Sequence, residues 1–243
     1  MRNVWTIAKR EFNMYFVSPV AYAVAFALLL VLGLIFYANL FAVAQSGGAP
    51  QPNQIISPFV TLMLFLTPAL TMRLMAEEQR TGTVELLLTA PVREWELVTG
   101  KWLAAFGFVA VIIFLTGIYP LILNQYTRPG IDQGSLLATY LGLFLVVGSM
   151  LALGVFVSTL FSNQIAAFFG TMALILALWL VALPVQNSTG LVADVLNYLD
   201  FSVHYYNNFF SGVVDLSDIA YFVSLVVLFL FLAARSVESR RWR

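Results

Sequence analysis

The chain has 243 residues, of which 61% are hydrophobic and only 10% charged, and its mean hydropathy is +0.90. A water-soluble domain of this length could not cover so much apolar surface, so the composition excludes an ordinary soluble protein and predicts a membrane protein. Basic and acidic residues balance at twelve each, which argues against nucleic acid as a partner, and the absence of cysteine excludes disulfides and cysteine-based metal sites.

Residues 1–18 show the pattern of an amphipathic helix. Val4, Ile7, Phe12 and Tyr15 recur at helical intervals, while basic residues lie off that face. Such a helix ahead of a membrane span is expected to lie along the inner leaflet.

Six apolar windows are long enough to cross a bilayer, which needs ~20 residues. Each is expected to be helical, because backbone groups in lipid must find hydrogen-bond partners within their own segment. Pro68 and Pro120 lie inside the second and third windows and predict kinks there. The first window is too long for a cleaved signal, so it is expected to remain as a span. The windows lie at about 20–44, 55–76, 100–124, 135–160, 165–186 and 217–234.

The basic residues predict the orientation of these spans. Eleven of the twelve fall on one side of the six-span arrangement, and only Arg128 falls on the other. The positive-inside rule makes the first side cytoplasmic, so both termini are expected in the cytoplasm and the chain in the inner (plasma) membrane, crossing it several times. The eleven are Arg2, Lys9, Arg10, Arg73, Arg80, Arg93, Lys101, Arg235, Arg240, Arg241 and Arg243.

The stretch 187–216, between the fifth and sixth spans, is rich in aromatic residues and contains no basic residue. Leu196, Leu199, Val203 and Phe210 recur at roughly helical spacing, which predicts one or two short helices entering the outer interface as a re-entrant or interfacial segment. A plain outer loop is the alternative.

A charged stretch, 76–102, separates the second and third spans. The sequence Thr81-Gly82-Thr83 is expected to end one helix and cap a second over 82–92, which Pro91 ends. Leu87 and Leu88 give this second helix an apolar stripe, and so short a helix is not stable alone in water. The stripe is therefore covered either by the protein's own inner helix ends and lipid, or by a groove on a cytoplasmic partner.

The residues of this stretch resemble the signature loop of ABC-2 type transporter permeases. Further similar motifs are residues 158–164, 209–216 and 240–242, so the resemblance covers most of the chain and is closest to the branch of gliding-motility-associated permease subunits. Ser211 departs from that branch, where a basic residue is expected before the glycine. The signature residues are Glu77, Glu78, Arg80, Gly82, Thr83, Glu85, Leu87, Leu88 and Pro91.

This resemblance implies a transport complex of several subunits. The signature loop would carry a coupling helix that engages a separate ABC ATP-binding subunit, present in two copies, which binds ATP and magnesium. A second permease half, identical or different, would complete the pathway, and an accessory subunit with a large outer domain is a further candidate partner. The chain itself has no GxxxxGK[ST] phosphate loop, so it is expected to hold no cofactor and not to be an enzyme.

ATP hydrolysis would then drive export of a lipid-like, amphipathic or polymeric substrate. Few charges occur within the spans, which argues against an ion-coupled carrier. A scaffold that anchors a cytoplasmic ATPase complex without transport is the alternative. Candidate lumen residues, for which ordinary helix packing is the competing interpretation, are Thr67, Thr71, Phe168, Phe169, Thr171 and Trp179.

A membrane enzyme is the other class considered. His204 is the only histidine, and Asp200, four residues earlier, is expected to bond its ring. No GxSxG or HExxH motif and no metal-ligand spacing occurs, so the histidine is interpreted as a hydrogen-bonded interfacial residue rather than a catalytic one.

Overall fold

The structure is a computed structural model that describes residues 2–46, 51–82, 92–127, 130–185 and 188–240. Every element in these ranges is helical, which confirms the predicted all-α class. The longer helices are α1 (Arg2–Tyr15), α2 (Pro19–Ser46), α3 (Pro52–Thr71), α6 (Glu94–Thr116), α8 (Gln133–Leu160), α9 (Gln164–Leu180) and α12 (Leu216–Arg240). The shorter ones are α4 (Ala76–Thr81), α7 (Ile118–Tyr126), η1 (Leu183–Val185), α10 (Leu191–Leu199), α11 (Phe201–His204) and the π-helical turn η2 (Tyr205–Phe209).

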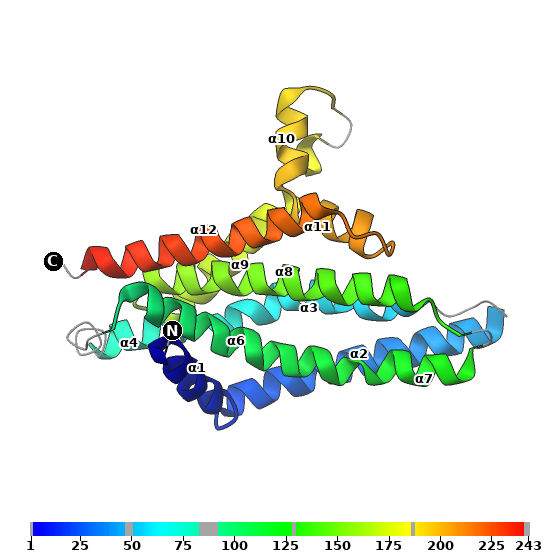
Figure 1. The fold of residues 1–243 in the computed structure, drawn as a ribbon, viewed down its shortest axis with the longest axis horizontal. Coiled ribbons are helices and arrows are strands. Elements are labelled where there is room, and N and C mark those ends of the chain that lie inside the picture. Colours follow the sequence, from blue (N-terminus) through cyan, green and yellow to red (C-terminus); the bar gives the residue numbers. More distant parts are fainter. Residues whose placement is uncertain (1, 47–50, 83–91, 128–129, 186–187, 241–243) are drawn as a thin grey trace.

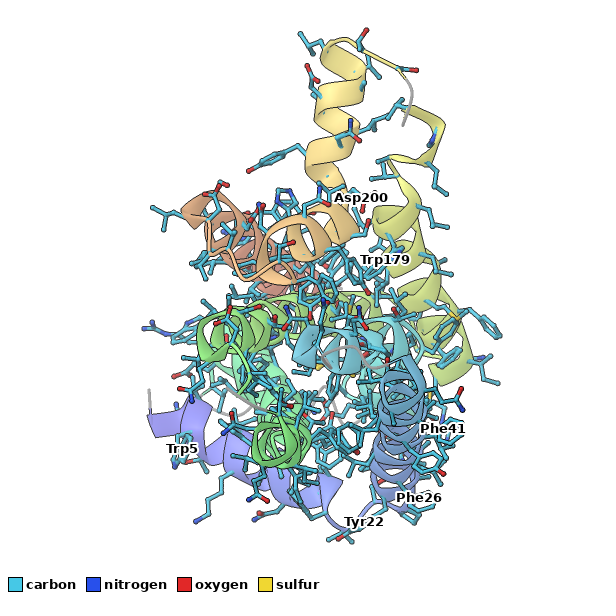
Figure 2. The ribbon with its side chains drawn as sticks, turned by 90° about the vertical axis from the view of Figure 1, so that its right-hand side faces the viewer. Trp5, Tyr22, Phe26, Phe41, Trp179 and Asp200 are labelled. Carbon is cyan, nitrogen blue, oxygen red and sulfur yellow. The ribbon has the colours of Figure 1, made fainter. Side chains whose placement is uncertain are left out.

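Six helical stretches within the described ranges are long and apolar enough to cross a membrane, as the hydropathy predicted. Apart from α9, which is inclined to the others, they run side by side along the long axis of the molecule (Figures 1 and 2). The stretches are Pro19–Gln45, Ile56–Thr81, Glu94–Gln125, Gln133–Leu160, Gln164–Val185 and Leu216–Ser239.

Helix α8 forms the centre of the bundle. Its span is 78% buried, and α3, α6, α9 and α12 pack around it. The π-helical turn η2 also packs on α8, and Gly142 permits this contact, because a Cβ there would lie 2.5 Å from the Cβ of Phe209. The outer helices are far more exposed: Tyr22, Phe26 and Phe41 of α2 point away from the bundle (Figure 2). Such apolar exposure suits a surface solvated by lipid rather than water.

The third span is interrupted near the predicted kink. Helix α6 ends at Thr116 and α7 begins at Ile118, with Gly117 between them. Pro120 has no backbone N–H to donate to the carbonyl of Thr116, which accounts for a break one turn before it. At Pro68, by contrast, α3 continues through the proline and ends three residues later at Thr71.

Helix α1 packs its apolar face against α6 rather than standing apart from the bundle. Tyr15 stacks on Phe108 with ring centroids 4.9 Å apart. A Cβ at Gly100 would lie 2.8 Å from Cγ2 of Ile7, so the two helix backbones approach closely. The opposite face carries Trp5, which is 71% exposed and points outward (Figure 2).

Helices α1 and α4 and the C-terminal end of α12 lie at the same end of the bundle, here called the basic end (Figure 1). The segment between α9 and α12 contains α10, α11 and η2, so its described part is mainly helical. Figure 1 shows α10 projecting sideways, away from the bundle axis. Its exposed side chains include Leu191, Val192 and Tyr198.

Candidate functional site

Helix α4 leads into the signature loop and is held by the end of α8. The Ser158 hydroxyl oxygen accepts hydrogen bonds from the backbone N–H groups of Met75 and Ala76, each at 3.1 Å. The Gln79 side chain donates to the Thr159 carbonyl at 2.9 Å. These bonds satisfy backbone groups at the start of α4 and fix its position on α8.

A buried ionic cluster ties α4 to α1 and α6. Lys101 is only 2% exposed, and its Nζ lies 2.8 Å from a carboxylate oxygen of Glu78 and 3.4 Å from one of Glu11. Arg10 reaches the same Glu11 oxygen at 2.7 Å. The ionic cluster, Arg10, Glu11, Glu78 and Lys101, therefore joins three helices through charges that burial makes dependent on one another.

Tyr15 reinforces the junction between α1 and α3. Its hydroxyl donates to the Leu70 carbonyl at 3.1 Å. Burial raises the pKa of Tyr15, and the nearby Glu11 carboxylate raises it further, against a smaller lowering by Arg73. The phenol therefore stays neutral and remains a donor.

The chain returns from the loop into α6 through a second fixed point. The Glu96 carboxylate accepts from the backbone N–H of Arg93 at 3.0 Å, as in a capping box. The Asn3 side chain donates to the same carboxylate at 3.2 Å. Both ends of the loop are thus attached to neighbouring helices, α4 to α8 and α6 to α1.

The structure places the described part of the predicted coupling residues in or beside α4. Gly82 has φ of +71° and ends α4 as a left-handed cap, in agreement with the predicted end of a helix. Glu77 pairs with Arg73 at 3.1 Å on an exposed face, and Arg80 is also exposed. The remaining predicted coupling residues, Thr83, Glu85, Leu87, Leu88 and Pro91, lie outside the described residues, as does most of the predicted helix 82–92.

The candidate lumen residues do not share one surface. Thr67, Thr71 and Thr171 are fully buried within this chain. Phe169 is 62% exposed on α9 and meets Phe168 edge to face. Trp179 packs edge to face against Tyr206, and Figure 2 shows it on the side of the bundle from which α10 projects.

The expected bond between His204 and Asp200 is absent, and Asp218 of α12 takes that place. Nδ1 of His204 lies 2.5 Å from Oδ1 of Asp218, and Nε2 lies 2.8 Å from the Tyr198 carbonyl. Both ring nitrogens therefore lie within hydrogen-bonding distance of oxygen atoms, one on α12 and one at the end of α10. Asp200 instead caps α11, accepting from the backbone N–H of Ser202 at 2.7 Å.

The sequence signal for this pair was weak, because Asp218 is fourteen positions from His204 and on another helix. Asp218 also accepts from the Asn208 side chain at 2.7 Å through its other oxygen, so both carboxylate oxygens help to join η2 and α11 to α12. No group of three or more metal-ligating side chains occurs among the residues that the structure describes. The hydrogen bonds among His204, Asp218 and Asn208 are therefore interpreted as structural.

The six long apolar helices of the described part define a helical membrane protein that crosses the bilayer several times. Residues 50–235 match the sequence profile of the ABC-2 family transporter proteins, and the chain belongs to this family. Its members are normally non-catalytic membrane subunits that work with an ATP-binding subunit. A comparison with curated proteins finds no match.

Proposed function

We propose that this chain is the membrane subunit of an ATP-binding cassette exporter and that its 82–92 segment receives motion from a separate ATPase. This proposal is supported by the attachment of the helices on both sides of that segment to neighbouring helices. Ser158 holds the start of α4, and Asn3 and Glu96 hold the start of α6. The helices α4 and α6 would move as rigid bodies, so a displacement of the segment would be transmitted through them to the second and third spans.

The charge distribution supports a cytoplasmic location for this end of the bundle. Eleven of the twelve basic residues fall on that side in sequence, so the positive-inside rule orients it inward across the plasma membrane. An ATPase that uses cytoplasmic ATP and magnesium could then reach the segment. Leu87 and Leu88 are the proposed anchors in a groove of the ATPase, with Glu85 beside them.

Two six-span halves and two ATPase subunits would form the complete exporter, with identical or different halves. Helix α9 supports this proposal, because its span is only 22% buried and Phe169 is exposed on it. This apolar face is suited to a second half as well as to lipid. Phe169 and Trp179 are the aromatic members of the candidate lumen set.

The proposed substrate is lipid-like, amphipathic or polymeric, because the spans carry few charges for an ion. The resemblance to gliding-motility-associated permeases supports a role in that branch, where an accessory subunit with an outer domain is a further candidate partner. The second candidate function is that of a membrane scaffold that does not transport, since the same 82–92 segment could anchor an ATPase complex.

The test is ATP-driven transport by the reconstituted complex. Leu87→Asp and Glu85→Lys are expected to leave the chain folded and to abolish the stimulation of the ATPase by this subunit and by substrate. Glu238→Lys, on an exposed turn of α12, is the matched charge-reversal control and should retain stimulation. Normal transport by both loop variants would refute coupling through the segment, whereas an ATPase that never responds to substrate would favour the scaffold.

A further inference from the structure

A cavity of about 800 Å³ opens at the basic end, between α1, the start of α2, the end of α3, and α4. It adjoins the ionic cluster, whose Lys101 and Glu11 form part of its wall. The cavity lies beside the turn at which the chain passes from α1 into its first span. Its walls therefore face the level at which lipid headgroups meet the hydrocarbon layer.

One side of the cavity is apolar and accessible. Met14 is 51% exposed, Val17 81% and Val20 38%, and all three line the cavity. Ala69 and Leu70 of α3 continue the apolar lining. A water-soluble ligand would gain nothing from this side, whereas an acyl chain or glycerol backbone would.

The other side is charged and balanced. Arg10, Arg73 and Lys101 face Glu11, Glu77 and Glu78 around the cavity. Lys101 and Glu11 are buried at 2% and 4% exposure and bond within the ionic cluster, so they form a fixed floor. Arg73, 43% exposed, and Glu77, 39% exposed, stand where a ligand can reach them.

These two residues offer opposite charges to a headgroup. The Arg73–Glu77 bond uses Nε of Arg73, one of the five N–H donors of a guanidinium. The planar terminal nitrogens suit a phosphate, which guanidinium groups bind through paired hydrogen bonds. The Glu77 carboxylate suits a primary ammonium group, which donates hydrogen bonds to it.

We propose that this cavity binds a zwitterionic glycerophospholipid with a primary ammonium headgroup, of the phosphatidylethanolamine type. The phosphate would lie at Arg73 and Arg10, the ammonium at Glu77, and the glycerol and acyl portion along Met14, Val17 and Val20. An anionic phospholipid could place its phosphate at Arg73 but would bring no ammonium group for the Glu77 carboxylate. A choline headgroup would match the charge but has no N–H to donate. The site needs only a membrane around the chain, so it is independent of transport and of any ATPase.

The test is lipid binding to the purified full-length chain in detergent, measured by native mass spectrometry. Phosphatidylethanolamine, phosphatidylcholine and phosphatidylglycerol with identical acyl chains are compared at equal concentrations. Phosphatidylethanolamine is expected to bind about tenfold more tightly than phosphatidylglycerol, as one charge-assisted hydrogen bond gained and one repulsion avoided would produce. Equal binding of the three lipids would overturn the proposal. Free phosphoethanolamine is the second arm, and binding as tight as that of the lipid would assign the cavity to a soluble phosphate compound instead.

Variants separate the headgroup contacts from general lipid adhesion. Arg73→Gln is expected to weaken the binding of phosphatidylethanolamine about tenfold. The matched control is Arg235→Gln, which should leave the binding unchanged, because Arg235 is exposed and pairs with Glu238 away from the cavity. Glu77→Gln should reverse the order of the two binding affinities, so that phosphatidylglycerol binds more tightly than phosphatidylethanolamine. A general loss of structure would not produce this reversal. Equal effects of Arg73→Gln and Arg235→Gln would refute the site. Should Arg73→Gln fail to fold, Val17→Asn on the exposed apolar side provides the test: unchanged lipid affinity there would refute it as well.

Discussion

Replacing Lys101 by methionine tests whether the ionic cluster holds the basic end together. Methionine keeps much of the length of the lysine side chain but removes the charge that Glu78 and Glu11 share. Breaking a buried ion pair by deleting one partner costs about 3–5 kcal/mol, because the other charge is left uncompensated. Glu78 is 18% exposed and Glu11 keeps its contact with Arg10, so we expect the lower end of that range, about 3 kcal/mol.

The measurement is the free energy of unfolding of the purified chain in mixed micelles, titrated with denaturing detergent and followed by tryptophan fluorescence. Lys9→Met, an exposed lysine on the same α1 helix that the cluster joins, is the control, expected to change stability by less than about 0.5 kcal/mol. Adding Glu78→Gln to Lys101→Met should recover about 1 kcal/mol, because the carboxylate charge that faced Lys101 is then removed together with the ammonium. A Lys101→Met variant as stable as Lys9→Met, or a double variant with purely additive losses, would refute the cluster as a structural joint.

Three further predictions concern helix contacts and use the same unfolding measurement. Gly100→Ala should destabilise the chain by about 1–3 kcal/mol, because the new Cβ would lie 2.8 Å from a methyl group of Ile7; an unchanged stability would mean that α1 does not pack there. Asp218→Ala should lower the free energy of unfolding by about 3 kcal/mol, because the buried His204 loses its partner. Asp200→Ala should lower it by only about 1 kcal/mol, because only the cap of α11 is lost. The reverse order would indicate that Asp200, as expected from the sequence, is the partner of His204. Ser158→Ala should cost about 1–3 kcal/mol and also weaken ATPase coupling, since two backbone N–H groups at the start of α4 lose their acceptor; wild-type stability would contradict that anchoring role.

Elements that depend on the solvent or on local backbone chemistry were readable from the sequence. Six spans followed from hydropathy, since a bilayer requires long helical apolar segments whatever their neighbours. The end of α4 at Gly82 followed from the ease with which glycine adopts a left-handed conformation. The interruption of the third span followed from Pro120, although the break lies one turn earlier, where the carbonyl that proline leaves unbonded is found.

Contacts between distant segments were not readable in the same way. A local i, i+4 rule suggested Asp200 for His204, but α11 gives way to a π-helical turn after four residues, and packing against α12 brings Asp218 to the ring instead. The three buried candidate threonines have the polarity of lumen residues, yet their side chains face the interior of this chain. Local sequence spacing carries no information about which helix packs against which.

The sequence by itself determined the membrane class, the number of spans and the family signature, because each depends on composition or on residues close together in the chain. Only the tertiary structure decided that Lys101 meets Glu78 and Glu11, that both ends of the signature loop are braced, and that a cavity with charged and apolar sides opens beside them. The physical reason is that burial of a charge must be compensated by whichever partner the packing supplies, and in this protein that partner lies as far as ninety residues away along the chain.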